Sequence, residues 1–287
     1  MDRHTIILTA DKRQEKLANL LEGERISYAW RESTGEEEVC EKVYVLPIPV
    51  TKLDKNPTLK QKLKEELISL CENPRARIKV FGGVFNTEWK LFLSEYQIPY
   101  WDFMKLPEVV EGNGWITAEA TVAEVLQHGE YSIYAQKVLV TGYGCCGKKI
   151  AKIFSDLGAE VTVAARRPAV RESIQKDGLQ AIDFLDMEKN IGDMSTVINT
   201  VPSMVLTERC IRRMSPSGCI IDIASSPGGT DFEAAKKYGI TAKLALGLPG
   251  LYTTTSSAKL LKDAISKYAP LQNEIREGKS WIFQIII

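Results

Sequence analysis

The chain has 287 residues, of which 44% are hydrophobic, and its 37 basic and 37 acidic side chains give a formal net charge of zero. This length exceeds what one core usually needs and predicts two domains. The balanced charge gives none of the basic excess that is typical of nucleic-acid-binding proteins. The first residues hold only a short apolar run, so we expect a cytoplasmic protein with neither a signal peptide nor a membrane anchor.

The cysteines show no metal-binding spacing; they lie at positions 40, 71, 145, 146, 210 and 219, and the two histidines are His4 and His128. We therefore expect no metal site and free thiols in a reducing compartment. The neighbouring cysteines 145–146 leave a redox pair open, although small residues also suit a tight loop. The closing run 281–287 is too short to span a membrane and is expected to be a docked tail or strand.

The N-terminal part alternates β-rich and helical segments. Strands are predicted at 4–9, 42–50 and 77–83, and helices at 59–72, at 87–96 and between a cap at Asp11 and a stop at Gly23, on the basis of residue type and apolar spacing. Pro47 and Pro49 break the second strand. This alternation predicts a parallel sheet covered by helices, which is a flavodoxin-like α/β domain over residues 1–115.

A helix is predicted to bridge the two domains. Residues 101–116 look irregular, with a loop at 111–115, and Thr117 is a suitable N-cap for a helix that ends at Gly129. We therefore assign residues 116–130 to the bridge.

The C-terminal part repeats the alternation. Strands are predicted at 137–141, 160–165, 179–184, 195–201, 218–224 and 241–247, and helices after residue 147 and at 168–177, 207–214, 231–238 and 256–269. Ile150, Ala151, Phe154 and Leu157 are the expected core face of the first of these helices. The pattern predicts a doubly wound Rossmann domain over residues 131–287, whose last helix could pack back on the N-terminal domain.

The run Gly-Tyr-Gly-Cys-Cys-Gly, residues 142–147, follows an apolar strand and opens an amphipathic helix. In a dinucleotide-binding unit the first glycine permits a tight turn, the second lets the backbone approach the pyrophosphate, and the third lets helix and strand pack closely. We assign these roles to Gly142, Gly144 and Gly147, with a purely structural turn as the alternative. The other predicted cofactor-binding residues of the loop are Tyr143, Cys145 and Cys146.

The end of the next strand indicates which nucleotide is bound. NAD sites usually place Asp or Glu there to bind the ribose 2′-hydroxyl, whereas this chain has Ala165, Arg166 and Arg167. Two guanidinium groups can bind a 2′-phosphate, so we expect NADP, with NAD as the second choice. A solvated strand end is the alternative interpretation of the two arginines.

Three later segments, 200–203, 224–229 and 247–250, follow predicted strands and are rich in small residues, Pro and Gly. Ligands of open α/β sheets bind beyond the carboxyl ends of the strands, so we expect these segments to face the nicotinamide, although ordinary loops share this composition. The predicted cofactor contacts are Thr200, Val201, Pro202, Ala224, Ser225 and Gly247.

Several stretches resemble the A subunit of bacterial dipicolinate synthase. They are INTVPSMVL (198–206), IDIASSPGGTDF (221–232), LGLPG (246–250) and the segments 116–138 and 158–168. The resemblance is good over residues 116–265 and weaker over 1–110. It implies a Rossmann domain like those of 2-hydroxyacid dehydrogenases and a nicotinamide-dependent oxidation of a dihydrodipicolinate-type ring to dipicolinate, a dicarboxylate of bacterial spores. It also implies that the partner is a flavoprotein-like B subunit, and we expect a homodimer or a larger assembly.

The chain departs from that family at three places. Cys145 and Cys146 stand where the family often has Arg-Thr, Ser226 stands where it tends to have Arg, and residues 252–255 replace an Ala-Pro pattern followed by Thr. A dicarboxylate substrate favours nearby cations, so the missing arginine weakens the clamp that the family implies.

Oxidation of a dihydropyridine requires a hydride acceptor, which is the cofactor, and the loss of a proton. No histidine follows a late strand, which argues against simple alcohol oxidation. Glu119, in the expected first turn of the bridging helix, is the candidate catalytic residue, with helix stabilisation as an equal alternative. We expect His128 to stabilise the end of that helix and Asp222 to be a buried structural carboxylate. The predicted substrate contacts are Thr117, Thr121, Ser225, Pro249 and Thr253.

Two other functions stay open at this point. One is a dehydrogenase for another small carboxylate, and the other is a non-catalytic nucleotide-binding subunit that senses redox state for a partner. The absence of a catalytic histidine keeps the second interpretation open.

Overall fold

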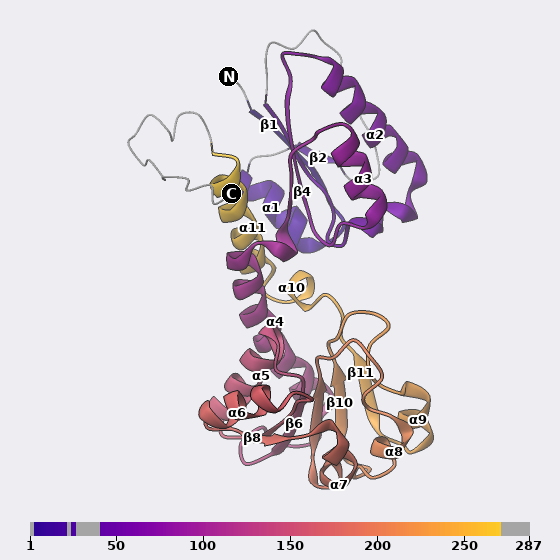
Figure 1. The fold of residues 1–287 in the computed structure, drawn as a ribbon, viewed down its shortest axis with the longest axis vertical. Coiled ribbons are helices and arrows are strands. Elements are labelled where there is room, and N and C mark those ends of the chain that lie inside the picture. The colour runs from indigo at the N-terminus through magenta and orange to yellow at the C-terminus, as the bar shows by residue number, and fades with distance from the viewer. Residues whose placement is uncertain (1–2, 22–23, 27–40, 271–287) are drawn as a thin grey trace. The chain divides into compact units, whose positions relative to one another are not determined.

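The computed structural model describes residues 3–21, 24–26 and 41–270, so Cys40 and the closing run 281–287 lie outside the described residues. Contacts between Cα atoms divide the chain into two compact units, Met1–Gly112 with Thr253–Ile287 and Asn113–Tyr252. Figure 1 labels the elements of both units. The domain bounds expected from the sequence stay a prediction.

The first unit contains a five-stranded sheet in the order β2-β1-β3-β4-β5, with every neighbouring pair parallel. Its strands are β1 (Arg3–Leu8), β2 (Glu24–Ile26), β3 (Glu41–Val45), β4 (Arg77–Gly82) and β5 (Tyr100–Asp102). Its helices are α1 (Lys12–Leu21), α2 (Pro57–Glu72), α3 (Thr87–Glu95) and α11 (Thr254–Tyr268), with 3-10 turns η1 (Val50–Lys55) and η2 (Phe103–Lys105). This is the flavodoxin strand order, which confirms the predicted fold of the N-terminal part.

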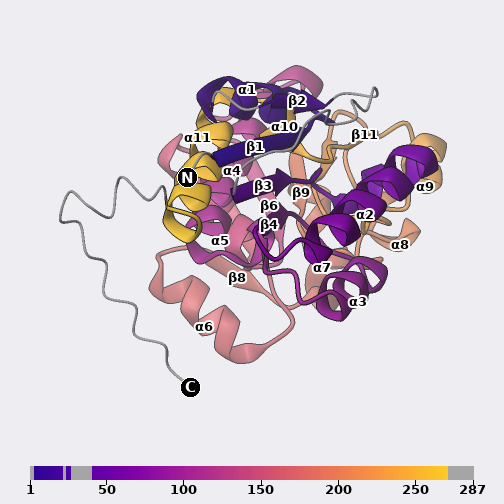
Figure 2. The ribbon, with the colours of Figure 1, turned by 90° about the horizontal axis from the view of Figure 1, so that it is seen from above.

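Alternating side chains of the first sheet pack into two separate layers, as the pleat of a strand requires. Tyr44 and Val80 join the core formed with α2 and α3, whereas Val43 and Phe81 join the core formed with α1 and α11. Figures 1 and 2 show these two helix pairs on opposite faces of the sheet. Both faces of the parallel sheet are therefore covered.

The second unit contains a six-stranded parallel sheet in the order β11-β10-β9-β6-β7-β8. Its strands are β6 (Lys137–Thr141), β7 (Glu160–Ala164), β8 (Gln180–Ile182), β9 (Thr196–Asn199), β10 (Cys219–Asp222) and β11 (Thr241–Leu244). The helices between them are α5 (Cys145–Asp156), α6 (Pro168–Lys176), α7 (Met187–Asn190), α8 (Glu208–Ile211), α9 (Phe232–Lys237) and α10 (Leu248–Leu251), with 3-10 turns η3 (Phe184–Asp186) and η4 (Ile191–Asp193). Read from β8, this is the 3-2-1-4-5-6 order of a Rossmann sheet, which confirms the predicted doubly wound fold.

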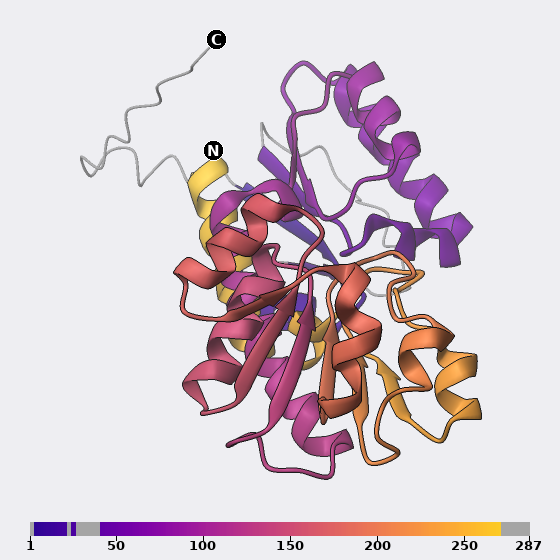
Figure 3. The same cartoon turned by 60° about the horizontal axis from the view of Figure 1, so that its bottom comes forward.

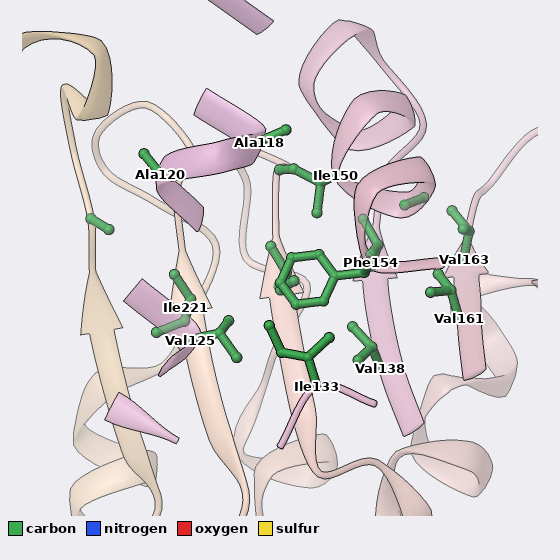
Figure 4. Packing of buried hydrophobic residues seen from close by; sticks show 14 of the residues in the cluster. Ala118, Ala120, Val125, Ile133, Val138, Ile150, Phe154, Val161, Val163 and Ile221 are labelled. Carbon is green, nitrogen blue, oxygen red and sulfur yellow. The ribbon is translucent and has the colours of Figure 1, made fainter. Parts of the chain in front are cut away.

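Helices cover both faces of the second sheet (Figure 3), and each face has its own core. Figure 4 shows Phe154 of α5 over the strands, close to Val138 and Ile133. Ile150, Ala151 and Phe154 are fully buried as predicted, but the prediction for Leu157 is wrong because its side chain is 44% exposed. Leu157 caps the end of α5, and Gly158 with φ +85° turns the chain away directly after it.

The bridging helix begins earlier than predicted: α4 is Pro107–His128, and Thr117, the predicted N-cap, lies in its interior. Proline suits a first helical position because its missing N–H has no intrahelical partner there. The two glycines that indicated a loop lie in this helix instead, packed closely against side chains of other helices. A Cβ on Gly112 would lie 2.5 Å from Leu260 Cδ1, and one on Gly114 would lie 2.8 Å from Lys149 Cδ.

Candidate nucleotide-binding site

The glycine loop connects β6 to α5, and its three glycines stand in three different environments. Gly142 has φ +88°, and a Cβ there would lie 2.7 Å from Thr200 Oγ1. A Cβ on Gly147 would collide with the carbonyl oxygen of Gly142, whereas one on Gly144 would meet no atom within 4 Å. The first and third glycines are therefore required by the fold, and the second leaves open space beside the backbone.

Gly144 is also the N-cap of α5, and no side chain caps that helix end. The first amide groups of a helix lack intrahelical acceptors and carry the positive end of its dipole. The open space at Gly144 therefore adjoins a set of N–H donors. This arrangement fits the pyrophosphate of a dinucleotide.

The two cysteines of the loop differ in exposure. Cys145 is exposed, and its Sγ accepts a hydrogen bond from Lys149 Nζ at 3.4 Å. Cys146 is half-buried, and burial, followed by the neighbouring Cys145, raises the pKa of its thiol. Neither cysteine forms a disulfide with any described residue. Cys145 is therefore the more accessible of the two thiols, and the raised pKa of Cys146 lowers the fraction of its reactive thiolate.

Tyr143 joins the loop to the residues that follow α6. Its hydroxyl donates to Asp177 Oδ2 at 2.8 Å, and Lys148 Nζ lies 3.0 Å from the same oxygen. Partial burial, and then the hydrogen bond to Asp177, raises the pKa of the Tyr143 phenol well above its ordinary value. Tyr143 therefore stays a neutral donor that ties the loop to Asp177.

A buried polar network joins the carboxyl ends of the central strands. Thr141 at the end of β6 donates through Oγ1 to Asn199 Oδ1 at 2.5 Å. Asn199 Nδ2 donates to Asp222 Oδ1 at 2.9 Å, and its Oδ1 accepts from Val201 N at 3.1 Å. The network therefore fixes where the chain leaves β9 toward residues 200–203. The role of Asn199 was not predicted, and its only signal in the sequence is a polar side chain at the end of an apolar strand.

Asp222 arranges the loop that follows β10. Besides Asn199, its oxygens accept from Ala224 N at 3.0 Å, Gly229 N at 2.9 Å and Thr230 Oγ1 at 2.7 Å. Asp222 has no exposed surface. It is the buried structural carboxylate that the sequence indicated, and four donors satisfy its charge.

The end of β7 carries the predicted arginines. Ala165 is buried, and Arg166 and Arg167 are exposed and form no ion pair with any described residue. A third arginine, Arg171 of α6, was not singled out in the sequence. Its Nη1 donates to the carbonyl oxygens of Ala165 and Arg166 at 2.8 Å each and to Asp183 Oδ2 at 2.6 Å.

The remaining predicted cofactor contacts follow β9, β10 and β11. Because carboxyl ends of parallel strands share one edge of a sheet, the second unit brings these residues to the edge that carries the glycine loop. Thr200 Oγ1 donates to the Thr141 carbonyl oxygen at 2.7 Å, and Gly247 has φ +68°. Pro202 and Ser225 are exposed, Val201 is half-buried and Ala224 is buried. Their contacts with a cofactor stay a prediction.

The predicted residues of the bridging helix lie in different surroundings from those expected. Glu119 is exposed but stands in the interior of α4 rather than in its first turn, so the helix-dipole argument for it was wrong. Thr117 is not an N-cap, and its carbonyl oxygen accepts a 2.7 Å bond from Oγ1 of the fully buried Thr121. The catalytic role of Glu119 and the substrate contacts of both threonines stay predictions.

The far end of α4 holds an acidic residue that the sequence did not single out. Glu124 is 6% exposed and accepts from Tyr252 OH at 2.8 Å, and its other oxygen lies 3.4 Å from His128 Nε2. His128 therefore pairs with a carboxylate on its own helix. Of the other predicted substrate contacts, Pro249 lies half-buried in α10, and Thr253, with φ +44°, is the N-cap of α11 and is grouped with the first unit.

Within the described residues, no group of three or more His, Cys, Asp and Glu side chains is placed to hold a metal ion. The helices in the same part of the chain are all too short or too polar to cross a membrane.

Comparison with known proteins agrees with this geometry. The family model described as "Alanine dehydrogenase/PNT, C-terminal domain" matches residues 112–275. The A subunit of dipicolinate synthase from Bacillus subtilis (strain 168) is 35% identical over 205 residues, which are 71% of this chain and 68% of that protein. The chain belongs to the family of dipicolinate synthase A subunits. The crystal structure of the dipicolinate synthase A chain from Bacillus subtilis matches at a TM-score of 0.74 and 25% identity, covering 97% of this chain and 98% of that one.

A more distant relative points to the same chemistry. "Alanine dehydrogenase" of Staphylococcus epidermidis is 31% identical over 157 residues, 47% of this chain and 42% of that protein. Family membership confirms the resemblance inferred from the sequence and supports an NAD(P)-dependent oxidoreductase that uses a nicotinamide cofactor. The Bacillus subtilis relative is named as one subunit of its synthase, which implies that it has a partner subunit.

Proposed function

We propose that the chain is an NADP-dependent oxidoreductase that oxidises a dihydrodipicolinate-type precursor to dipicolinate. One observation carries the cofactor assignment. Gly144 leaves open space at the start of α5, which no side chain caps, and this helix start lies at the carboxyl ends of the strands, where nucleotides bind in this fold. The substrate assignment, a small dicarboxylate, is supported by similarity to the Bacillus subtilis relative, which is named for dipicolinate synthesis. By the same similarity we propose that the partner is a second, flavoprotein-like subunit.

The preference for NADP is supported by the end of β7. Arg166 and Arg167 are exposed there, and neither has a carboxylate partner among the described residues. Guanidinium groups bind phosphate through paired, charge-assisted hydrogen bonds. An uncharged 2′-hydroxyl would use neither charge, so this strand end suits a 2′-phosphate better.

The nicotinamide ring, when bound, supplies the hydride acceptor for the oxidation. The chain's own contribution is to hold the loops after β9 and β10 through Asn199 and Asp222. Ser225, exposed after β10, is the candidate donor to a substrate carboxylate. Glu119 is the candidate proton acceptor, and we expect Glu119→Gln to lower kcat by about 100-fold without changing cofactor affinity.

Nucleotide titration tests the cofactor assignment. Replacing Arg166 and Arg167 together with Gln should weaken NADP binding about 10- to 100-fold, because two charged hydrogen-bond donors are lost, and should leave NAD binding within about twofold. Arg212→Gln is the matched control, since Arg212 is a half-exposed arginine of the same unit that pairs with Glu188 at 3.3 Å. Equal affinities of the unmodified protein for NADP and NAD would contradict the NADP assignment.

Turnover tests the substrate assignment. The full chain, with and without its proposed partner, should form NADPH and dipicolinate from freshly generated dihydrodipicolinate. Saturable NADP binding without turnover under both conditions would favour the non-catalytic, redox-sensing alternative. Turnover of a different small carboxylate alone would favour the other alternative.

A further inference from the structure

Arg171 joins three segments beside the proposed phosphate site. It lies in α6, and its Nη1 donates to the carbonyl oxygens of Ala165 and Arg166, both at 2.8 Å, and to Asp183 Oδ2 at 2.6 Å. The Arg171 and Asp183 side chains are only 24% and 26% exposed. A partly buried, charge-assisted pair of this kind is more rigid than an exposed one.

Asp183 is itself anchored. It follows β8 directly, and its second oxygen accepts from Leu185 N at 3.0 Å. The ends of β7 and β8 are also joined by the bond from Ala165 N to the Ile182 carbonyl oxygen at 3.0 Å. The turn that carries Arg166 and Arg167 is therefore held from both α6 and β8.

We infer that Arg171 and Asp183 are positioning residues that set the turn at Ala165–Arg167 and thereby the preference for a nucleotide with a 2′-phosphate. This inference rests on the proposed use of NADP. Arg171 is not the phosphate ligand, because its Nη1 is shared among three oxygens and its charge is balanced by Asp183. The pair acts through the backbone carbonyls at the turn, which direct where the side chains of Arg166 and Arg167 emerge.

A positioning role and a purely electrostatic role predict opposite results for Asp183→Ala. Removing a carboxylate near a phosphate site should tighten NADP binding if only charge mattered. If Asp183 positions the turn, the same substitution should lower the ratio of NADP to NAD affinity by roughly tenfold, because both phosphate ligands lose their placement. Asp183→Asn keeps an oxygen acceptor and should restore most of that ratio.

The experiment is a titration of NADP and NAD into the full chain, its Asp183→Ala and Asp183→Asn forms and Arg171→Lys. NAD affinity reports folding in each variant, since NAD lacks the discriminating phosphate. Arg171→Lys retains the charge but not the planar guanidinium, so positioning predicts a lower ratio and charge alone predicts no change. Arg171→Lys answers the question even if Asp183→Ala does not fold.

The matched control is Glu188→Ala, which breaks the pair between Glu188 and Arg212 in the same unit and should leave the ratio unchanged. An unchanged or raised ratio in Asp183→Ala, or an unchanged ratio in Arg171→Lys, would overturn the inference while leaving the NADP proposal in place. Equal affinities of the unmodified protein for NADP and NAD would overturn both.

Discussion

Asn199 donates a hydrogen bond through Nδ2 to Asp222 Oδ1 at 2.9 Å, and this bond joins β9 and β10 where both strands end. Neither side chain has any exposed surface. The same pair also bonds the backbone of the two loops that follow these strands. One buried amide and one buried carboxylate therefore fix the loops at the carboxyl ends of these strands, where the proposed cofactor site lies.

Asp222→Ala should destabilise the chain by roughly 3 kcal/mol or more, because it leaves four buried donors without their acceptor. Chemical unfolding followed by circular dichroism measures this change. Asp193→Ala is the control: Asp193 is 81% exposed and lies 3.8 Å from Lys137, so its removal should cost at most about 0.5 kcal/mol. Equal stability losses in the two variants would show that the network does not hold the strand ends.

Gly144→Ala and Gly147→Ala form a matched pair that separates binding from folding. Gly144 has φ −80° and open space around its Cα, so alanine should change stability by no more than about 0.5 kcal/mol. Its methyl group would occupy the space proposed for the pyrophosphate, and we expect at least about tenfold weaker nucleotide binding. Calorimetric titration of the folded variant tests this, and undiminished affinity would contradict the placement of the cofactor.

Gly147→Ala should show the reverse order of effects. Its Cβ would collide with the Gly142 carbonyl oxygen, and a backbone atom cannot move aside as a flexible side chain can. We expect a stability loss of about 1–3 kcal/mol, measured by thermal unfolding without nucleotide. A Gly147→Ala protein as stable as the unmodified chain would show that helix and strand do not need this close contact.

The hydrogen bond from Tyr143 to Asp177 should stabilise the folded chain only above a certain pH. The hydrogen bonds from Lys148 and then from Tyr143 lower the pKa of Asp177 below its ordinary value of 3.8. Because the folded pKa is depressed, the stabilisation is full above the ordinary pKa and is lost as pH falls through the folded value. Urea unfolding at a series of pH values should show a higher free energy of unfolding for the unmodified chain than for Asp177→Asn. This difference should disappear only at acidic pH.

Tyr143→Phe provides the control for that series. It removes one of the donors that favour ionised Asp177, so the pKa of Asp177 should rise. The stability difference caused by Asp177→Asn should then disappear at a higher pH. A difference between the unmodified chain and Asp177→Asn that stays constant down to the lowest pH would contradict the assignment.

The two loop thiols should react at different rates. Cys146 is half-buried and burial raises the pKa of its thiol, so alkylation of Cys146 at neutral pH should be slower than that of exposed Cys145. Peptide mass spectrometry distinguishes the sites. Bound NADP should slow labelling of Cys145 but not of Cys71, an exposed thiol in the first unit. Equal labelling of Cys145 with and without NADP would place the nucleotide elsewhere.

Most of the fold could be predicted from local pattern. Apolar runs ending in glycines, such as the β6 strand before Gly142, identify buried parallel strands because both faces of such strands are covered. The three loop glycines could be assigned because each has a separate backbone requirement. The three-residue strands β2 and β5 were not predicted, whereas β8, which is equally short, was predicted within the run 179–184.

The rest depended on packing between distant residues. Gly112 and Gly114 indicated a loop, and only the structure shows that both lie in a helix, packed closely against the side chains of Leu260 and Lys149. In the sequence, Arg171 is one of several charged residues on a predicted helix. Only its hydrogen bonds to the Ala165 and Arg166 carbonyl oxygens distinguish it. The roles that could not be predicted from local sequence are those that depend on contacts with residues distant in the chain.

The grouping of α11 with the first unit has a consequence for biosynthesis. Leu261 and Ile265 of α11 share a core with Leu17 of α1 and with Ile7 of β1. A nascent chain emerging from the ribosome can complete its Asn113–Tyr252 unit before α11 exists. The α1–β1 segment, which is synthesised before that unit, therefore keeps one apolar face bare until α11 has left the ribosome, and a chaperone can bind this face during that interval.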